Sequence, residues 1–172
     1  GAEILITDDA DSFKTVADEL GLDHQVCKGH VKRNTEALIE SLKPAAAQDE
    51  DGSLSTIGVA PEQGVADLER LRKLILSRQP KEQTELGTMH FRYLEAAPPG
   101  QGEQATIAYR LRLLFLDRWN LWSRLTRYRT WQGPEGQTID GTNNASERAI
   151  GWWIKERYRT MRGYKRPKSA VN

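Results

Sequence analysis

The hydrophobic positions near the start of the chain predict two strands that alternate with two helices. Residues 3–7 (EILIT) form a short apolar run of strand type that ends at two aspartates. Residues 13–20 carry apolar side chains at helical spacing, and residues 24–27 (HQVC) follow as the natural second parallel strand. Residues 31–42 return to helical spacing, and Pro44 is expected to end that helix.

The middle of the chain is predicted to be a helical block. Residues 43–60 are small and polar, which is typical of a mobile linker or loop. Apolar residues then recur at helical spacing, with interruptions at proline- and glycine-containing turns. The expected helices are one from Pro61 that Pro80 ends, a weaker one over 86–97 and a long one over 105–131, with a loop over 132–141.

A final helix is predicted within residues 142–172. Thr142, Asn143 and Asn144 are all good N-cap residues, and an acid, Glu147, lies in the first turn. Helical spacing from Glu147 gives a mostly apolar face, with a basic stripe one step around the helix. The final helix is therefore expected to pack by one face while its neighbouring face carries positive charge.

Charge is distributed unevenly along the chain. The full sequence of 172 residues has a formal net charge of +1, but residues 148–172 hold eight Lys/Arg and one acid, a net +7, so the remainder carries −6. A basic segment of this kind is the electrostatic footprint of a nucleic-acid contact, although a solvated cationic helix is the alternative on charge alone. The phosphate-binding candidates are Arg148, Lys155, Arg159, Arg162, Lys165 and Arg166.

The order of these residues resembles a known pattern. The end of the catalytic domain of DDE-type insertion-sequence transposases, in the RNase H-like or retroviral integrase superfamily, has a T-N-N-x-x-E-R helix start followed by a basic run and an R-G segment. The matching positions here are Thr142, Asn143, Asn144, Glu147, Arg148, Arg162 and Gly163.

The resemblance implies an α/β fold with a partial RNase H-like core, made of strand–helix–strand–helix plus a C-terminal helix, and a mainly α-helical insertion. Residues 1–43 would form the core part that holds the second acid and a C-x-x-H motif. Residues 44–141 would be the insertion, and residues 142–172 the core helix with the third acid and the basic segment.

The resemblance also implies a chemistry, namely metal-dependent cleavage and strand transfer at transposon ends. Asp8 and Glu147 would be the second and third catalytic acids and would hold Mg²⁺ or Mn²⁺, since carboxylate-held metals activate the attacking oxygen and stabilise the leaving one. Asp9 competes with Asp8, and because neighbours on a strand face opposite sides, only one of the two should point inward. The resemblance favours Asp8, since the family places its acid directly after the apolar strand. A simple polar turn and helix cap is the alternative for both. The first acid is expected on a strand before Gly1, so this chain alone is expected to be incomplete and inactive.

Cys27 and His30 form a C-x-x-H pair with the spacing of half a zinc site, and His24 could add a third ligand. No second C/H pair exists, so a small buried cysteine and a packing or capping histidine are the alternative. The resemblance makes Cys27, His30 and Asn144 neighbours of the active site. It also suggests base stacking for Trp119 and Trp122, although aromatic residues at helical spacing are usually core.

The expected partners are double-stranded DNA, both transposon ends and target, and a second copy in a homodimer. No apolar run approaches the ~20 residues of a membrane span, so no membrane partner is expected. The resemblance implies a cytoplasmic, nucleoid-associated protein of prokaryotic type, and a single cysteine excludes an internal disulfide. The rival interpretations are a non-catalytic DNA-binding module derived from a transposase, and an unrelated helical protein in which Asp8 and Glu147 lie far apart.

Overall fold

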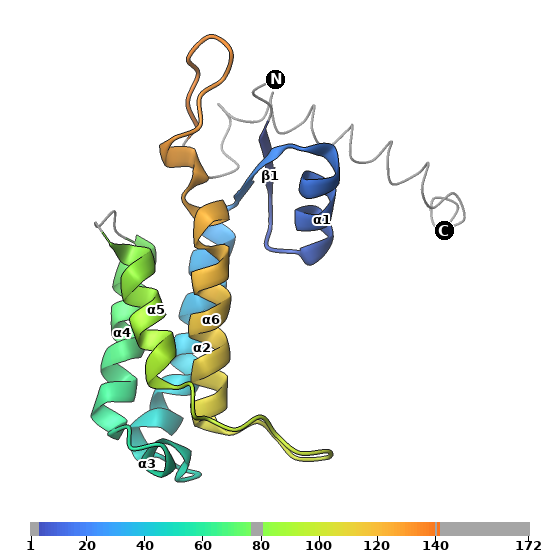
Figure 1. Ribbon diagram of the computed structural model, residues 1–172. Helices are drawn as coiled ribbons and strands as arrows, with labels where there is room; N and C mark the ends of the chain where they lie inside the picture. The colour runs from blue at the N-terminus through green and yellow to red at the C-terminus, as the bar shows by residue number, and fades with distance from the viewer. Residues whose placement is uncertain (1–3, 77–80, 140, 142–172) are drawn as a thin grey trace. The chain divides into compact units, whose positions relative to one another are not determined.

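The computed structural model describes residues 4–76, 81–139 and 141, and shows a mixed α/β protein that is mostly helical (Figure 1). None of the helices in these ranges is long and apolar enough to cross a lipid bilayer. The elements are β1 (Ile4–Thr7), α1 (Asp11–Leu20), β2 (Asp23–Val26), α2 (Lys28–Gln48), α3 (Ser53–Thr56), α4 (Pro61–Leu76), α5 (Glu82–Arg92), α6 (Ile107–Leu125) and a short 3₁₀ turn η1 (Arg127–Arg129).

The chain divides into two compact units. The first comprises Gly1–Val31 and Ser123–Asn172, and the second comprises Lys32–Trp122. Both α2 and α6 have residues in each unit. The domain limits expected from the sequence, 1–43, 44–141 and 142–172, stay predictions.

The first unit contains a parallel βαβ arrangement, as the sequence predicts. β1 pairs with β2 in parallel, from Ile4 opposite Asp23 to Thr7 opposite Val26. All four residues of β1 are buried, which is typical of a parallel strand covered on both faces. Whether this small sheet belongs to an RNase H-like core stays a prediction.

Different segments cover the two faces of the sheet. Ile4 and Ile6 pack with Trp131 and Ile139, from the segment that follows η1. Leu5 packs with Ala17 of α1 on the opposite face. The N-terminal strand is therefore covered by a local helix on one side and by a segment more than a hundred residues away in sequence on the other.

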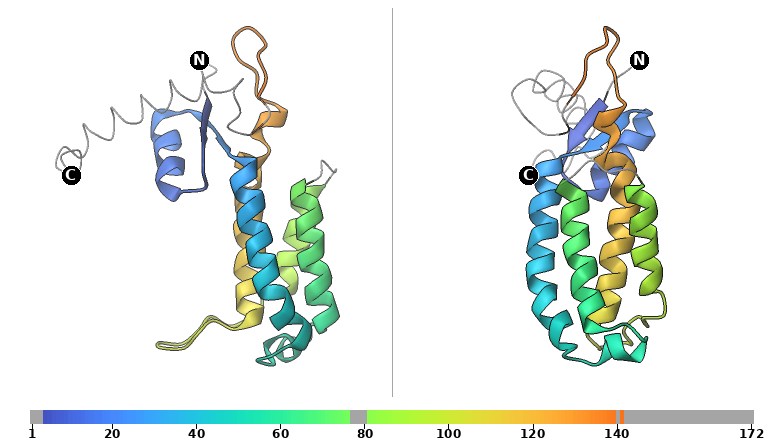
Figure 2. Two further views of the ribbon diagram at one scale, coloured as in Figure 1. Left: turned by 180° about the vertical axis from the view of Figure 1, so that it is seen from behind. Right: turned by 90° about the vertical axis from the view of Figure 1, so that its left-hand side faces the viewer.

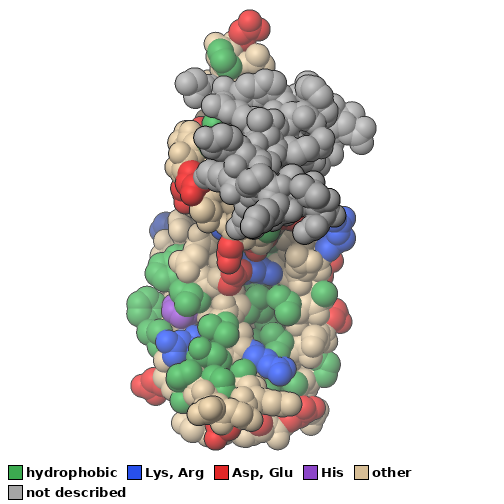
Figure 3. Space-filling view, turned by 90° about the vertical axis from the view of Figure 1, so that its right-hand side faces the viewer, with side chains coloured by type: hydrophobic (Ala, Val, Ile, Leu, Met, Phe, Trp, Pro, Cys, Tyr) green, Lys and Arg blue, Asp and Glu red, His purple; other side chains and the backbone are tan. Residues whose placement is uncertain are grey.

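The second unit is a helical bundle. Figure 2 shows α2, α4, α5 and α6 running alongside one another. Its core is aliphatic and aromatic, and the Tyr93 and Phe115 rings stack at 5.5 Å between centroids. Figure 3 shows hydrophobic side chains gathered over one side of the bundle. Among the described residues, the large hydrophobic side chains that are exposed are Leu38, Phe91, Leu94 and Leu113.

Pro44 does not end the second helix, contrary to the sequence prediction. α2 continues through Pro44 to Gln48. A proline inside a helix removes one backbone hydrogen bond and crowds the preceding turn. Here Leu42 and Ala46 on either side of Pro44 are buried, and this tertiary packing holds the helix together while Pro44 itself is exposed.

The region over 43–60, predicted to be a mobile linker or loop, is in part helical: α2 covers 43–48 and α3 covers 53–56, with loops at 49–52 and 57–60. The Asp49 carboxylate accepts hydrogen bonds from the Leu54 and Ser55 backbone N–H groups at 3.0 and 3.1 Å, and so satisfies two N–H groups in the first turn of α3. Asp49 itself has a left-handed φ of 44°. The long helix expected to reach residue 131 ends earlier, at Leu125.

Candidate functional site

The carboxyl ends of the two strands meet at one edge of the small sheet. Thr7 and Val26 form the last pair, and the Cys27 N–H donates to the Thr7 carbonyl oxygen at 2.6 Å. Asp8 follows β1 directly, and α2 begins at Lys28, directly after Cys27. Open α/β sheets commonly bind ligands at the carboxyl ends of their strands, and Asp8 lies at such an end, while its role as a catalytic acid stays a prediction.

Asp8 and Asp9 have different surroundings. The Asp8 side chain is exposed, and it makes no ion pair with any residue in the described ranges. Asp9 is partly buried, and its carboxylate lies 2.6 Å from the Lys14 ammonium of α1. Asp9 thus takes part in a structural ion pair, whereas Asp8 has an exposed carboxylate, an oxygen ligand of the kind that Mg²⁺ or Mn²⁺ prefers.

His24 is held in the interior of the first unit by two partners. Arg124 donates to His24 Nδ1 at 2.9 Å, and His24 Nε2 lies 2.7 Å from the Thr7 hydroxyl oxygen. Burial, with the positive charge of Arg124 as a further cause, lowers the His24 pKa from 6.5 to about 4. The ring is therefore neutral near pH 7, and both of its nitrogens are engaged.

The interpretation of Cys27, His30 and His24 as zinc ligands gains no support from this arrangement. Both His24 nitrogens already have partners, and Cys27 is a buried free thiol. No three His, Cys, Asp or Glu side chains gather into a metal-binding group anywhere in the part of the chain that the structure describes. His30, in the first turn of α2, stays a candidate neighbour of the Asp8 edge.

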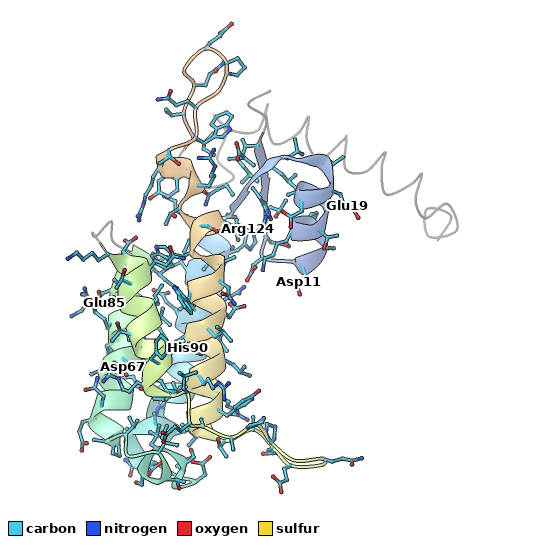
Figure 4. The ribbon with its side chains drawn as sticks, viewed as in Figure 1. Asp11, Glu19, Asp67, Glu85, His90 and Arg124 are labelled. Carbon is cyan, nitrogen blue, oxygen red and sulfur yellow. The ribbon has the colours of Figure 1, made fainter. Side chains whose placement is uncertain are left out.

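The segment after α6 is held against β2 by polar residues of the strand. The buried Gln25 amide donates to the Leu125 carbonyl oxygen and its carbonyl oxygen accepts from the Tyr128 N–H, both at 2.7 Å. Arg127 forms an ion pair with Asp23 at 3.1 Å. Figure 4 labels Arg124, the partner of His24, at the end of α6.

The same segment returns to the carboxyl edge of the sheet at Gly141. The Lys28 N–H, in the first turn of α2, donates to the Gly141 carbonyl oxygen at 2.9 Å. Gly141 has a φ of +82°, and a Cβ there would lie 2.9 Å from both the Lys28 side chain and the Tyr128 ring. Lys28 Nζ lies 4.0 Å from the centre of that ring. Only glycine fits this close approach, so the chain is fixed beside Cys27 and Lys28 just before Thr142.

The two candidate tryptophans belong to the helical unit. Trp122 is 4% exposed, and its indole N–H donates to the buried Glu82 carboxylate at 3.0 Å. Trp119 is partly buried, and it covers Gly87, where an added Cβ would lie 3.4 Å from the indole. Both contacts are those of core residues, the more ordinary of the two interpretations, and base stacking would require Trp122 to leave its contact with Glu82.

Other buried polar groups of the helical unit satisfy one another. Asp67, labelled in Figure 4, accepts from the Tyr93 hydroxyl at 2.6 Å and from Arg92 at 2.8 Å. Burial and this carboxylate raise the Tyr93 pKa well above its ordinary value. The group is fully paired and lies within the bundle, so its arrangement is that of a structural network.

The remaining predicted site residues lie outside the described ranges. They are Glu147, Asn144, Arg148, Lys155, Arg159, Arg162, Lys165 and Arg166.

Sequence reasoning missed the roles of Thr7 and Arg124, and it considered His24 only as a metal ligand. The sequence did offer one indication of these contacts. His24 and Gln25 are polar residues in a short strand that was expected to be parallel. Parallel strands are usually buried, and a buried polar side chain requires a hydrogen-bond partner.

The comparisons with known proteins add no family to this geometry. No protein-family model matches the sequence, and no curated protein and no solved structure is significantly similar to the chain.

Proposed function

We propose that the chain is part of a DDE transposase that cleaves DNA at transposon ends and joins it to a target, with Mg²⁺ or Mn²⁺. The observation that carries the proposal is the return of the chain to the Asp8 edge of the sheet at Gly141. Three segments far apart in sequence meet there: Cys27 is hydrogen-bonded to Thr7, and the next residue, Lys28, is hydrogen-bonded to Gly141. The T-N-N-x-x-E-R motif starts at the next residue.

Chain length alone restricts the position of the second candidate acid. Glu147 follows Gly141 by six residues, and six residues span at most about 20 Å even when fully extended. A helix start within that stretch would shorten the span further. The segments that contain Asp8 and Glu147 are therefore close enough to supply one shared metal site, as the proposal requires.

Each group has a distinct role in the proposed reaction. When bound, the metal ions would make water or a 3′-hydroxyl nucleophilic and stabilise the leaving oxygen. Asp8 and Glu147 would hold the metal, and Cys27, His30 and Asn144 would be neighbours of that site. The basic side chains from Arg148 to Arg166 bind phosphates and position the duplex without reading its sequence.

The proposal extends to the partners and the setting. The partners are the double-stranded transposon ends and the target duplex, with a second copy of the protein completing the assembly. Trp119 or Trp122 would stack on a base that is opened at the transposon end. The protein would work in the cytoplasm of a prokaryotic cell, at the nucleoid.

Substitution of the acids tests the proposal, in the natural protein that contains this chain. Glu147→Gln or Asp8→Asn should reduce strand cleavage at least 1,000-fold, on the order of the effect of losing a group that acts on the transition state, with little change in DNA affinity. Asp9→Asn is the matched control and should retain cleavage, because Asp9 is paired with Lys14. Cleavage by the Glu147→Gln variant would reject the assignment, and salt-dependent DNA binding without cleavage by the unaltered protein would select the non-catalytic module.

A further inference from the structure

The backbone on both sides of Asp8 is held by hydrogen bonds. The Cys27 N–H donates to the Thr7 carbonyl oxygen at 2.6 Å, which orients the peptide plane before Asp8. The Thr7 hydroxyl donates to the Asp8 carbonyl oxygen at 2.7 Å, which orients the plane after it. Because both flanking planes are fixed, the direction of the Asp8 Cα–Cβ bond is fixed as well, although the side chain is exposed.

The hydrogen of the Thr7 hydroxyl is directed by His24. Arginine can only donate, so His24 Nδ1 accepts from Arg124 and the proton of the neutral ring lies on Nε2. Nε2 then donates to the Thr7 oxygen at 2.7 Å, which leaves the hydroxyl hydrogen of Thr7 free to point at the Asp8 carbonyl. Each group therefore donates a hydrogen bond to the next, from Arg124 to His24, from His24 to Thr7 and from Thr7 to the Asp8 carbonyl oxygen.

Arg124, the first donor of this series, also has a carboxylate partner. Arg124 donates to both carboxylate oxygens of Asp18 in α1, at 3.0 and 3.2 Å. His24 and Thr7 are each only 4% exposed, so water does not compete for their hydrogen bonds. The network thus connects α1, the end of α6 and β2 to a single backbone carbonyl, that of Asp8.

We propose that His24, acting through the Thr7 hydroxyl, is a positioning residue for the Asp8 carboxylate. The inference rests on the proposed function in assigning Asp8 to the metal. A protein binds a metal more weakly when the side chain that holds the metal must first be ordered. Groups that orient such a side chain in advance commonly raise metal affinity by about 10–100-fold. His24 and Thr7 supply that order before the metal arrives.

Two substitutions at residue 7 test the proposal. In the natural protein that contains this chain, Thr7→Val removes the hydroxyl and keeps the shape, whereas Thr7→Ser keeps the hydroxyl. Thr7→Val should raise the Mn²⁺ concentration for half-maximal cleavage about 10-fold or more, with DNA affinity unchanged. Thr7→Ser should stay within about 3-fold of the unaltered protein. Thr88→Val is the control, because the Thr88 hydroxyl also donates to a backbone carbonyl but lies in α5.

A second pair of variants covers the case in which Thr7→Val does not fold. His24→Gln keeps one donor and one acceptor and should retain most of the Mn²⁺ affinity, whereas His24→Leu should lose it in parallel with Thr7→Val. If Thr7→Val or His24→Leu lowers the urea midpoint of unfolding but leaves the Mn²⁺ dependence of cleavage unchanged, the inference is overturned and the proposed function stays intact. If the unaltered protein neither binds Mn²⁺ nor cleaves DNA, the proposed function fails and the inference fails with it.

Discussion

His24 links the stability of the first unit to pH. Its pKa is about 4 in the folded protein, chiefly because of burial, whereas an exposed histidine in the unfolded chain titrates near 6.5. Between these values the unfolded state binds the additional proton, so stability rises with pH from 4 to 6.5. We expect acidification from pH 7 to pH 4 to remove up to about 3 kcal/mol of unfolding free energy through this residue.

Urea unfolding at closely spaced pH values, followed by circular dichroism, measures this contribution. His24→Gln is the control, because glutamine does not titrate and the other acidic groups of the chain are unchanged. The difference between the two stability curves should be constant above about pH 6.5 and should narrow toward pH 4. Parallel curves across that window would contradict a depressed His24 pKa.

Some single residues could be placed from the sequence, and others could not. Asp8 could be placed at the end of a strand, because an apolar run followed by acids is a local pattern. The preference for Asp8 over Asp9 comes from the resemblance, which places its acid directly after the apolar strand. The structure distinguishes the two aspartates by another feature, the ion pair of Asp9 with Lys14. The network of His24 with Arg124 joins residues one hundred positions apart, and no spacing rule shows it.

At the scale of elements, the N-terminus of α6 is capped by a loop far away in sequence. The Asp51 carboxylate accepts from the Ile107 N–H at 2.9 Å, and the Ser53 hydroxyl accepts from the Ala108 N–H at 3.0 Å. A helix leaves its first N–H groups without intrahelical partners, so these bonds satisfy two of them. The loop after α2 and the first residue of α3 therefore together cap the start of α6.

Removing this cap should destabilise the helical unit. Asp51→Ala is expected to lower the free energy of unfolding by about 1–2 kcal/mol, which is the usual cost of losing an N-cap. Glu95→Ala, which removes an exposed carboxylate in the same unit, should change it by less than about 0.5 kcal/mol. Urea unfolding followed by circular dichroism compares the two. Equal effects of both variants would show that the cap contributes nothing beyond its charge.

The elements themselves were predictable where one local pattern dominates. The stripe of apolar residues over 61–75 predicts α4, which the structure confirms as Pro61–Leu76. The prediction at Pro44 was wrong because it used only the low helix propensity of proline. In the folded protein, burial of the neighbouring residues Leu42 and Ala46 keeps the helix continuous. The loop over 49–52 was predicted to be mobile because its composition is polar. In the folded protein its aspartates accept hydrogen bonds from backbone N–H groups of α3 and α6, and these contacts cannot be seen in the local sequence.

At the scale of the whole molecule, the separation of charge predicts how DNA binding depends on salt. Residues 148–172 carry a net +7 and the remainder −6, so phosphate contacts should depend on that one segment. Replacing Arg159 and Arg162 by glutamine should reduce the slope of log K against log salt by about 1.8, or about 0.9 for each phosphate lost. Replacing the exposed Lys81 and Arg110 of the helical unit removes the same net charge and should leave the slope unchanged. Titrations of duplex DNA at several salt concentrations measure both slopes, and equal reductions would mean that net charge, rather than a defined phosphate contact, governs binding.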